Sequence, residues 1–272
     1  MIFNNKIIRS GNSTEIYRYA KYQDIQENGV ITHDNKHAKS ENLKSSKVNV
    51  TNCNEKTGAE NRFSIRNPLS IQRSKRTVRR LIECNINQHN ETDKFVTLTF
   101  DSRKCKNKTG INRKYVVYAQ KEFMRKMSKL YGDFKYISVI EIGENGTKRL
   151  HIHLLFFGLK YIHHTKLKRI WNKGSVDIRK LNDVGYNASA ISAYMTKYFT
   201  KTLSDYSFFE RGKKCYSCSR GLKKPEVIYT CDKEVMYSYL ENAGDKQFQV
   251  ECDNEYVGKF KYMKFSKPLE DK

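Results

Sequence analysis

Two short apolar stretches separated by a single turn constrain the fold of this chain most strongly. Residues 134–142 (FKYISVIEI) and 149–158 (RLHIHLLFFG) are rich in β-branched and aromatic residues, and GENG lies between them at 143–146. Stretches of this composition favour strands, and a short glycine-containing turn joins neighbouring strands in antiparallel orientation. The sequence therefore predicts an antiparallel hairpin near the middle of the chain.

Further helical and strand patterns flank this hairpin. The expected elements are a basic helix after Pro68, a strand over 94–100, a helix over 112–131 that ends at Gly132, a short helix around 167–171, a strand over 175–181 and a helix over 188–203 with Asn187 as its N-cap. Apolar residues at helical spacing and β-branched runs distinguish the two kinds of element. The order predicts an α+β fold, an antiparallel β-sheet flanked by helices.

The composition along the chain suggests three regions. Residues 1–66 are polar and rich in Asn, Lys, Ser and Glu, which predicts a weakly ordered, irregular N-terminal arm. The α+β domain is expected over residues 67–240, and residues 241–272 are expected to form a C-terminal extension.

Charge indicates the class of partner. The chain has 272 residues, and 52 Lys and Arg against 29 Asp and Glu give a formal charge of +23. With 18 Tyr and 14 Phe as possible stacking surfaces, nucleic acid is the favoured polyanion, against a generic basic surface protein. Five residues of the helix after Pro68 are candidate phosphate contacts, although a solvated helix face has the same composition: Arg73, Lys75, Arg76, Arg79 and Arg80.

Apolar runs and cysteines bear on location. No apolar run approaches the roughly 20 residues that span a bilayer, so no membrane partner is expected. Seven scattered cysteines do not form a disulfide pattern, which predicts a cytosolic protein with reduced thiols. The Cys215–Cys218 pair, with Cys231 and Cys252 downstream, has a spacing that permits structural zinc, against free thiols as the default.

The hairpin contains two histidines where a buried strand would have apolar residues. His151 and His153 point to the same face because strand side chains alternate. Glu141 on the preceding strand falls close to opposite them, and Glu144 is the second choice if the register differs by a residue. Two imidazoles and a carboxylate are suited to Mg²⁺ or Mn²⁺ at a phosphate, whereas the alternative is ordinary polar residues on a half-exposed strand.

The helix over 188–203 contains two tyrosines four residues apart, Tyr194 and Tyr198, with Lys197 and Lys201 just outside them. Side chains at this spacing are neighbours on a helix, so both phenols can be offered to one site. A tyrosine oxygen is a competent nucleophile toward phosphorus when cations activate it. The alternative is a pair of amphipathic tyrosines with the ring inward and the hydroxyl in water.

Together these two stretches resemble the HUH endonucleases that start rolling-circle replication, and most closely the initiators of microvirus-type single-stranded-DNA bacteriophages and their plasmid-like relatives. The resemblance covers about residues 73–229 and includes KFVTLTF, IEIGENGTKRLHIHLLFFG, WNKGSVDIRKL, YMTKYFTK and SRGLKKPEVIY. Leu150 stands where the family usually has proline. The resemblance implies Glu141, His151 and His153 as metal ligands, Tyr194 and Tyr198 as catalytic tyrosines, and Lys197 between them.

What the resemblance implies is a site- and strand-specific nicking and rejoining enzyme of RRM-like or ferredoxin-like topology. It would act with Mg²⁺ or Mn²⁺ through a 5′-phosphotyrosine on single-stranded and origin DNA, with host helicase and polymerase as further partners in the host cell cytoplasm. The contact with DNA would include Lys201 and the basic helix. Two alternatives remain: a relaxase or transposase of the same chemistry, and a non-catalytic protein that binds or packages single-stranded DNA.

Overall fold

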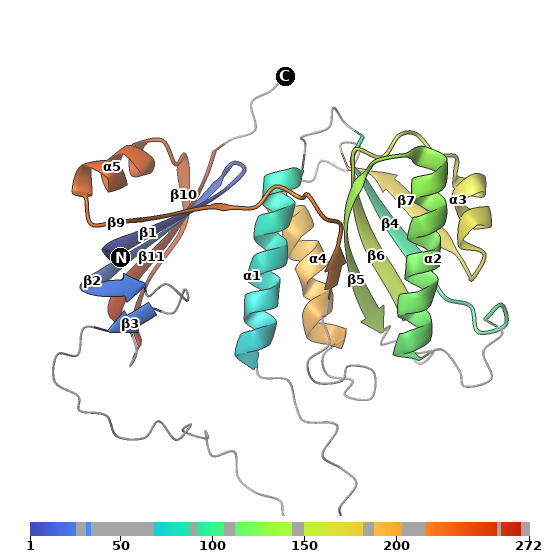
Figure 1. Ribbon diagram of the computed structural model, residues 1–272, viewed down its shortest axis with the longest axis horizontal. Coiled ribbons are helices and arrows are strands. Elements are labelled where there is room, and N and C mark those ends of the chain that lie inside the picture. Colours follow the sequence, from blue (N-terminus) through green and yellow to red (C-terminus); the bar gives the residue numbers. More distant parts are fainter. Residues whose placement is uncertain are drawn as a thin grey trace, which may run out of the picture. The chain divides into compact units, whose positions relative to one another are not determined.

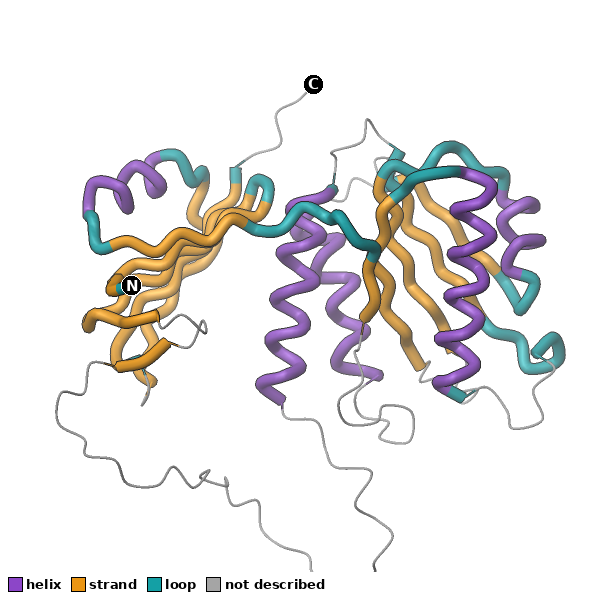
Figure 2. The backbone as a smooth tube through the Cα atoms, viewed as in Figure 1, coloured by secondary structure: helices purple, strands orange, loops and turns teal. Residues whose placement is uncertain are grey.

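The chain divides into two compact units, and each is described by itself. The computed structural model describes residues 1–25, 31–33, 68–86, 92–105, 112–142, 150–181, 188–202, 216–254 and 257–267. One unit contains residues 1–61 and 226–272, and the other contains residues 62–225. The strands and helices of both units are drawn in Figure 1 and, coloured by type, in Figure 2. Within the described residues no helix has the length and apolar character needed to cross a membrane.

The unit of residues 62–225 is built on a five-stranded antiparallel sheet. Its strands, in the spatial order β7-β4-β6-β5-β8, are β7 (Val176–Lys180), β4 (Lys94–Thr99), β6 (Leu150–Phe157), β5 (Lys135–Ile142) and β8 (Tyr216–Cys218). Helices α2 (Arg113–Tyr131) and α3 (His164–Trp171) connect β4 to β5 and β6 to β7. The chain order strand, helix, strand, strand, helix, strand with this spatial order is the ferredoxin-like arrangement. The predicted α+β fold class is confirmed.

Helices cover both faces of this sheet, because strand side chains alternate and both faces contain apolar residues. On one face Leu98, Ile152 and Phe156 pack with Phe123 of α2 and Trp171 of α3. On the other face a second apolar cluster joins the sheet to α1 (Pro68–Asn85) and α4 (Ala188–Thr202). Figure 1 shows α2 and α3 on one side of the sheet and α1 and α4 on the other.

The α1/α4 face contains fewer apolar positions toward one end of the strands. Leu155 and Phe95 of the sheet contact the cluster that includes Val78 of α1 and Met195 of α4. Burying each side chain of this size contributes about 1.5–3 kcal/mol, so this cluster fixes both helices on the sheet. Further along the same strands and on the same face, the residues are the histidines of β6 and the threonines of β4. The core therefore leads directly into a polar region.

Local signals set the ends of α2 as the sequence predicts. The Asn112 side chain accepts a hydrogen bond from the backbone N–H of Tyr115 at 2.9 Å, which satisfies one of the helix's first amides. At the other end Gly132 adopts a φ of 72°, and its N–H donates to the Ser128 carbonyl. Glycine takes this left-handed conformation without strain.

The unit of residues 1–61 and 226–272 is a second antiparallel sheet with one helix. The strands are β1 (Ile2–Ser10), β2 (Ser13–Ile25), β3 (Ile31–His33), β9 (Glu226–Thr230), β10 (Asp245–Asn254) and β11 (Gly258–Ser266), in the order β10-β11-β2-β1-β9 with β3 paired to β2. Helix α5 (Lys233–Glu241) packs on one face, where Leu240 and Ala243 meet Ile7, Ile16 and Met263.

The irregular arm predicted for residues 1–66 is wrong for residues 2–25, which form β1 and β2; residues 34–67 lie outside the described part of the chain. The boundary expected at residue 240 also differs, because β9 pairs with β1 and the expected C-terminal extension supplies β10 and β11. The physical reason is distance along the sequence. The strands that bury residues 2–25 follow more than 200 residues later, so no local pattern announces the sheet.

Candidate active site

The hairpin of β5 and β6 brings the predicted carboxylate to the histidines. Glu141 lies directly opposite His151, and Val139 lies opposite His153. All three polar side chains project to the α1/α4 face, because Glu141, His151 and His153 occupy alternate or cross-strand positions. Glu144 belongs to residues 143–149, outside the described residues. The predicted juxtaposition of one carboxylate with two imidazoles is therefore present.

The Glu141 carboxylate contacts His153 rather than its direct cross-strand partner. Glu141 Oε2 lies 2.7 Å from His153 Nε2. The side chains are 13% and 5% exposed, so the pair is largely shielded from water. A hydrogen bond with an ionised acceptor in such surroundings is short and strong, and it orients both groups.

Two threonines of β4 hold the histidine rings. Thr97 lies opposite His153 and Thr99 opposite His151, with Oγ1 to Nδ1 distances of 3.2 and 3.0 Å. In the tautomer in which each Nδ1–H donates to its threonine, Nε2 presents the lone pair that binds a cation. The rings are nearly parallel, 18° apart with centroids 6.1 Å apart.

The chemistry of these donors suits a divalent cation. Two ligand atoms at right angles, each about 2.1 Å from one ion, are about 3 Å apart, close to the Glu141–His153 separation of 2.7 Å. Among the described residues, however, no three His, Cys, Asp or Glu side chains lie close enough together to hold a metal ion. Bringing His151 into one coordination shell requires a change of side-chain rotamer. The metal stays a prediction.

The tyrosine helix reaches the histidines through one ring. Tyr194 packs edge-to-face on Phe95 of β4, with centroids 5.3 Å apart and planes at 70°. Phe95 in turn stacks on His153 at 5.8 Å and 22°. Tyr194 remains 45% exposed while Phe95 is buried, so the phenol lies at the surface above a fixed ring. Tyr194 and the predicted metal ligands therefore lie on one face of one sheet.

The remaining predicted catalytic and DNA-contacting residues of α4 are less fully placed. Lys197 is exposed. Tyr198 and Lys201 belong to α4, but their side chains lie outside the described residues. On α1, Val78 and Ile82 are buried against the sheet, which leaves the basic residues on the outer side of the helix. Arg73, Arg76 and Arg79 are exposed, and Lys75 and Arg80 are partly exposed.

Sequence reasoning missed the supporting residues of β4 and β7. Phe95, Thr97 and Thr99 alternate along KFVTLTF, so a period-two reading of that strand would place them on one face. The exposed ion pair of Asp177 and Arg179, at 2.9 Å on β7, lies opposite Thr97 and Phe95. Only the cross-strand register reveals this neighbourhood, because β7 follows β4 by about 80 residues of sequence.

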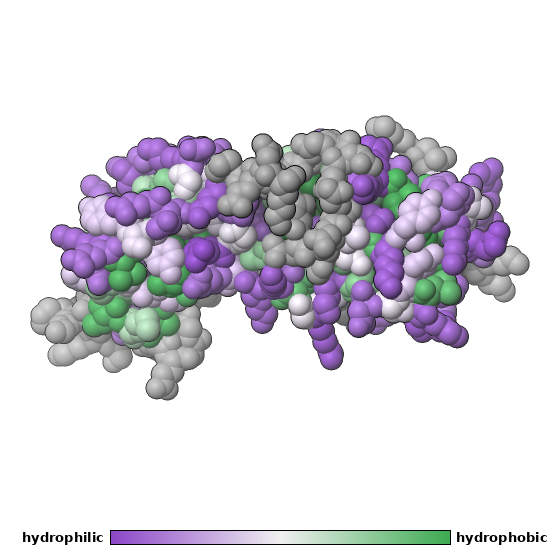
Figure 3. Space-filling model, turned by 90° about the horizontal axis from the view of Figure 1, so that it is seen from above, coloured by the Kyte–Doolittle hydropathy of each residue, from purple (hydrophilic) through white to green (hydrophobic). Residues whose placement is uncertain are grey.

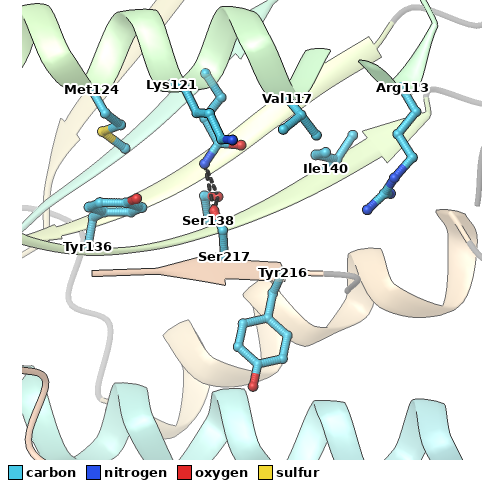
Figure 4. Close-up of a pocket in the computed structure, with 10 residues that line it drawn as sticks. Arg113, Val117, Lys121, Met124, Tyr136, Ser138, Ile140, Tyr216 and Ser217 are labelled. Atoms are coloured by element: carbon cyan, nitrogen blue, oxygen red, sulfur yellow. Dashed lines mark hydrogen bonds between the residues drawn. The ribbon is translucent and has the colours of Figure 1, made fainter. Parts of the chain in front are cut away.

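A separate pocket of about 250 Å³ lies on the opposite face of the sheet, between α2, β5 and β8. Figure 4 shows Val117, Lys121 and Met124 of α2 above Tyr136 and Ser138 of β5. Its polar groups already bond one another: Gln120 Nε2 donates to Ser138 Oγ at 2.6 Å and to Ser217 Oγ at 2.7 Å. The pocket is not part of the histidine site, whose side chains project from the other face.

One comparison with known proteins bears on this site. Residues 93–203 match the family model of the replication-associated protein ORF2. This segment runs from β4 to α4 and contains the hairpin, the threonines and both tyrosines, but it is under half of the chain. Searches of curated proteins and of solved structures give no match. The sheet that carries the candidate site is thus similar to replication-associated proteins of this family.

Proposed function

We propose that this protein initiates rolling-circle DNA replication by nicking and rejoining one DNA strand through a phosphotyrosine. The observation that carries the proposal is the ring contact that places Tyr194 next to the histidine site: Tyr194 on Phe95 at 5.3 Å, and Phe95 on His153 at 5.8 Å. A nucleophile, a carboxylate–histidine pair and a basic helix on one face are the parts that phosphoryl transfer on DNA needs. The similarity of residues 93–203 to replication-associated proteins supports the same function.

In the proposed reaction the Tyr194 oxygen attacks a backbone phosphorus as it loses its proton. The bond from phosphorus to the 3′ oxygen breaks, and that oxygen takes up a proton to become a 3′-hydroxyl that can prime a polymerase. The 5′ phosphate is then joined to the tyrosine. Because one phosphate ester replaces another, the bond energy is retained and rejoining needs no nucleotide cofactor.

The chain's own residues would position the phosphate. His151 and His153, oriented by Thr99 and Thr97, together with Glu141, would hold Mg²⁺ or Mn²⁺. Such an ion polarises a phosphate oxygen and neutralises charge that develops on it. The exposed Lys197, three residues after Tyr194, would add a positive charge near the same phosphate.

A second tyrosine one helical turn away suits the second cleavage that ends a replication round. Tyr194 would still be joined to DNA when the origin is regenerated, so Tyr198 would attack next and release the displaced strand. We assign the first attack to Tyr194, which contacts Phe95 in the sheet.

A trapping experiment tests the proposal. The protein is incubated with Mn²⁺ and single-stranded oligonucleotides that contain a randomised segment, and adducts that survive denaturant are collected. We expect wild-type adducts to contain one preferred cleavage sequence and a phosphotyrosyl peptide within Ala190–Lys201. The double variant Tyr194→Phe with Tyr198→Phe keeps both rings and removes both nucleophiles, so it should form no adduct.

Tyr118→Phe is the matched control, because Tyr118 is 56% exposed on α2, which packs on the other face of the sheet. It should form adducts at the wild-type rate. A wild-type protein that binds DNA but forms no adduct would instead support a non-catalytic binding or packaging protein. Cleavage without a strand that returns to the regenerated origin would support a relaxase or transposase.

A further inference from the structure

The sheet of residues 1–61 and 226–272 has two unlike faces. Ile7, Ile16 and Met263 project toward α5 and form the apolar core of this unit. Their chain neighbours must project the other way, because strand side chains alternate. The register places Tyr17 between Lys6 on β1 and Tyr262 on β11 on that opposite face.

Aromatic rings lie across this second face, which we call the aromatic face. In one row across the strands the residues are Val250, Tyr262, Tyr17, Lys6 and Tyr229. In the next row Phe260 lies opposite Tyr19.

The rings contact one another in a continuous series. Tyr17 lies 4.9 Å from Tyr262 and 6.4 Å from Phe260, and Tyr19 lies 5.7 Å from Phe260. Phe248 extends the series at 6.1 Å from Tyr262.

These rings are accessible rather than sealed in a core. Phe248 is 53% exposed, and Tyr17, Tyr19, Phe260 and Tyr262 are partly exposed. Two phenols are fixed in place, since Tyr17 and Tyr262 each donate to Glu15 Oε2 at 3.2 Å. Burial and the neighbouring tyrosines raise the pKa of Tyr19 to about 12, so its ring stays neutral at physiological pH. A soluble protein leaves so many rings at one surface when that surface has a partner.

Positive charge accompanies the rings. Lys6 Nζ lies 5.3 Å from the centroid of the Tyr229 ring, and Lys264 occupies the row next to Tyr262, opposite Glu15. Glu15 is buried with its carboxylate on the two phenols. The accessible charges of the row are therefore cationic. Figure 3 shows that hydrophilic and hydrophobic side chains also alternate over the described surface seen from above.

We propose that the aromatic face binds single-stranded DNA, with unpaired bases stacked on Tyr17, Phe260 and their neighbours and with lysines on the phosphates. Rings that lie across a sheet can stack only on bases freed from a duplex, and such stacking tolerates any sequence. The identity of the polyanion rests on the proposed function, because a nicked and displaced origin strand is single-stranded. The face itself belongs to a different unit from the tyrosines of α4.

Binding without cleavage tests this proposal separately from catalysis. Fluorescence anisotropy in EDTA measures the affinity of the full chain for oligothymidylate of about 16 nucleotides. Replacing Tyr17 and Phe260 together by Leu keeps apolar side chains and removes two rings, so the dissociation constant should rise at least about 10-fold. The matched control is Tyr237→Leu, a 52% exposed tyrosine on α5, which should bind like wild type. Equal binding by the double variant, or an equal loss in the control, overturns the proposal.

A second measurement uses the unaltered protein, so it stands even if the double variant fails to fold. Oligonucleotides with 5-iodouracil are cross-linked by light to the wild-type chain, and the modified peptides are identified by mass spectrometry. We expect cross-links at residues of β2 and β11. Cross-links confined to residues 68–202 overturn the aromatic face and leave the proposed nicking function intact, whereas its failure is an absent phosphotyrosyl adduct. A double variant that changes the sedimenting mass but not the DNA affinity marks the face as an interface between copies, which also overturns the proposal.

Discussion

Phe95 is the residue through which Tyr194 meets the histidine site, and replacing it tests that geometry. Phe95→Leu keeps an apolar side chain in a position that is 8% exposed and removes two ring contacts, one with Tyr194 and one with His153. Contacts of this kind contribute about 0.5–1.5 kcal/mol each beyond buried area. We therefore expect the free energy of unfolding to fall by about 1–3 kcal/mol, measured by urea denaturation.

A double-mutant cycle isolates the Tyr194 contact. Phe95→Leu and Tyr194→Ala are measured singly and together, and the expected coupling is about 0.5–1.5 kcal/mol. The matched control is Phe157→Leu, since Phe157 is also buried in the same apolar cluster and lies two residues beyond Leu155, the cross-strand partner of Phe95. Its coupling to Tyr194→Ala should be close to zero.

The same change should slow chemistry. A phenol that loses its supporting ring is displaced, and a shift of about 1 Å in a reacting group can cost about 100-fold in rate. We expect Phe95→Leu to form the covalent adduct about 10- to 100-fold more slowly while the protein stays folded at about 25 °C. Coupling indistinguishable from zero, or equal coupling for Phe157, would refute the reasoning that Phe95 positions Tyr194.

Three further outcomes follow from the structure. Mn²⁺ at about 100 times its dissociation constant should stabilise the wild-type protein by about 2.7 kcal/mol in thermal unfolding, and this gain should vanish in His153→Ala and shrink in Glu141→Gln; unchanged stabilisation in both would dismiss these ligands. Arg76 and Arg79, exposed on α1, should each contribute about 0.7 to the slope of log affinity against log salt on single strands, so Ala at both lowers the slope by about 1.4. Because burial raises the pKa of Tyr19 from 10.0 to about 12, the neutral phenol favours the folded state fully below pH 10, and that contribution is lost as the pH rises through 12. Tyr19→Phe should therefore flatten the loss of unfolding free energy between these two pH values in urea titrations, and an unchanged curve would count against a buried phenol.

Much of the unit that carries the candidate site is determined by local sequence. The hairpin of β5 and β6 follows from two β-rich runs and a short turn, and this alone places Glu141 opposite His151. The ends of α2 follow from Asn112 and Gly132. Such features depend on contacts between residues close in sequence, which periodicity and turn chemistry report directly.

Tertiary structure decided what depends on partners distant in sequence. Thr97 and Thr99 orient the histidines only because β4 pairs with β6, more than 50 residues later, and Tyr194 meets Phe95 only because α4 packs across the sheet. The sheet of β1, β2, β9, β10 and β11 is the extreme case. Its strands are polar and short when taken singly, and each becomes half-buried only through neighbours from the other end of the chain. Strand pairing of this range depends on register and burial that no local window of sequence contains.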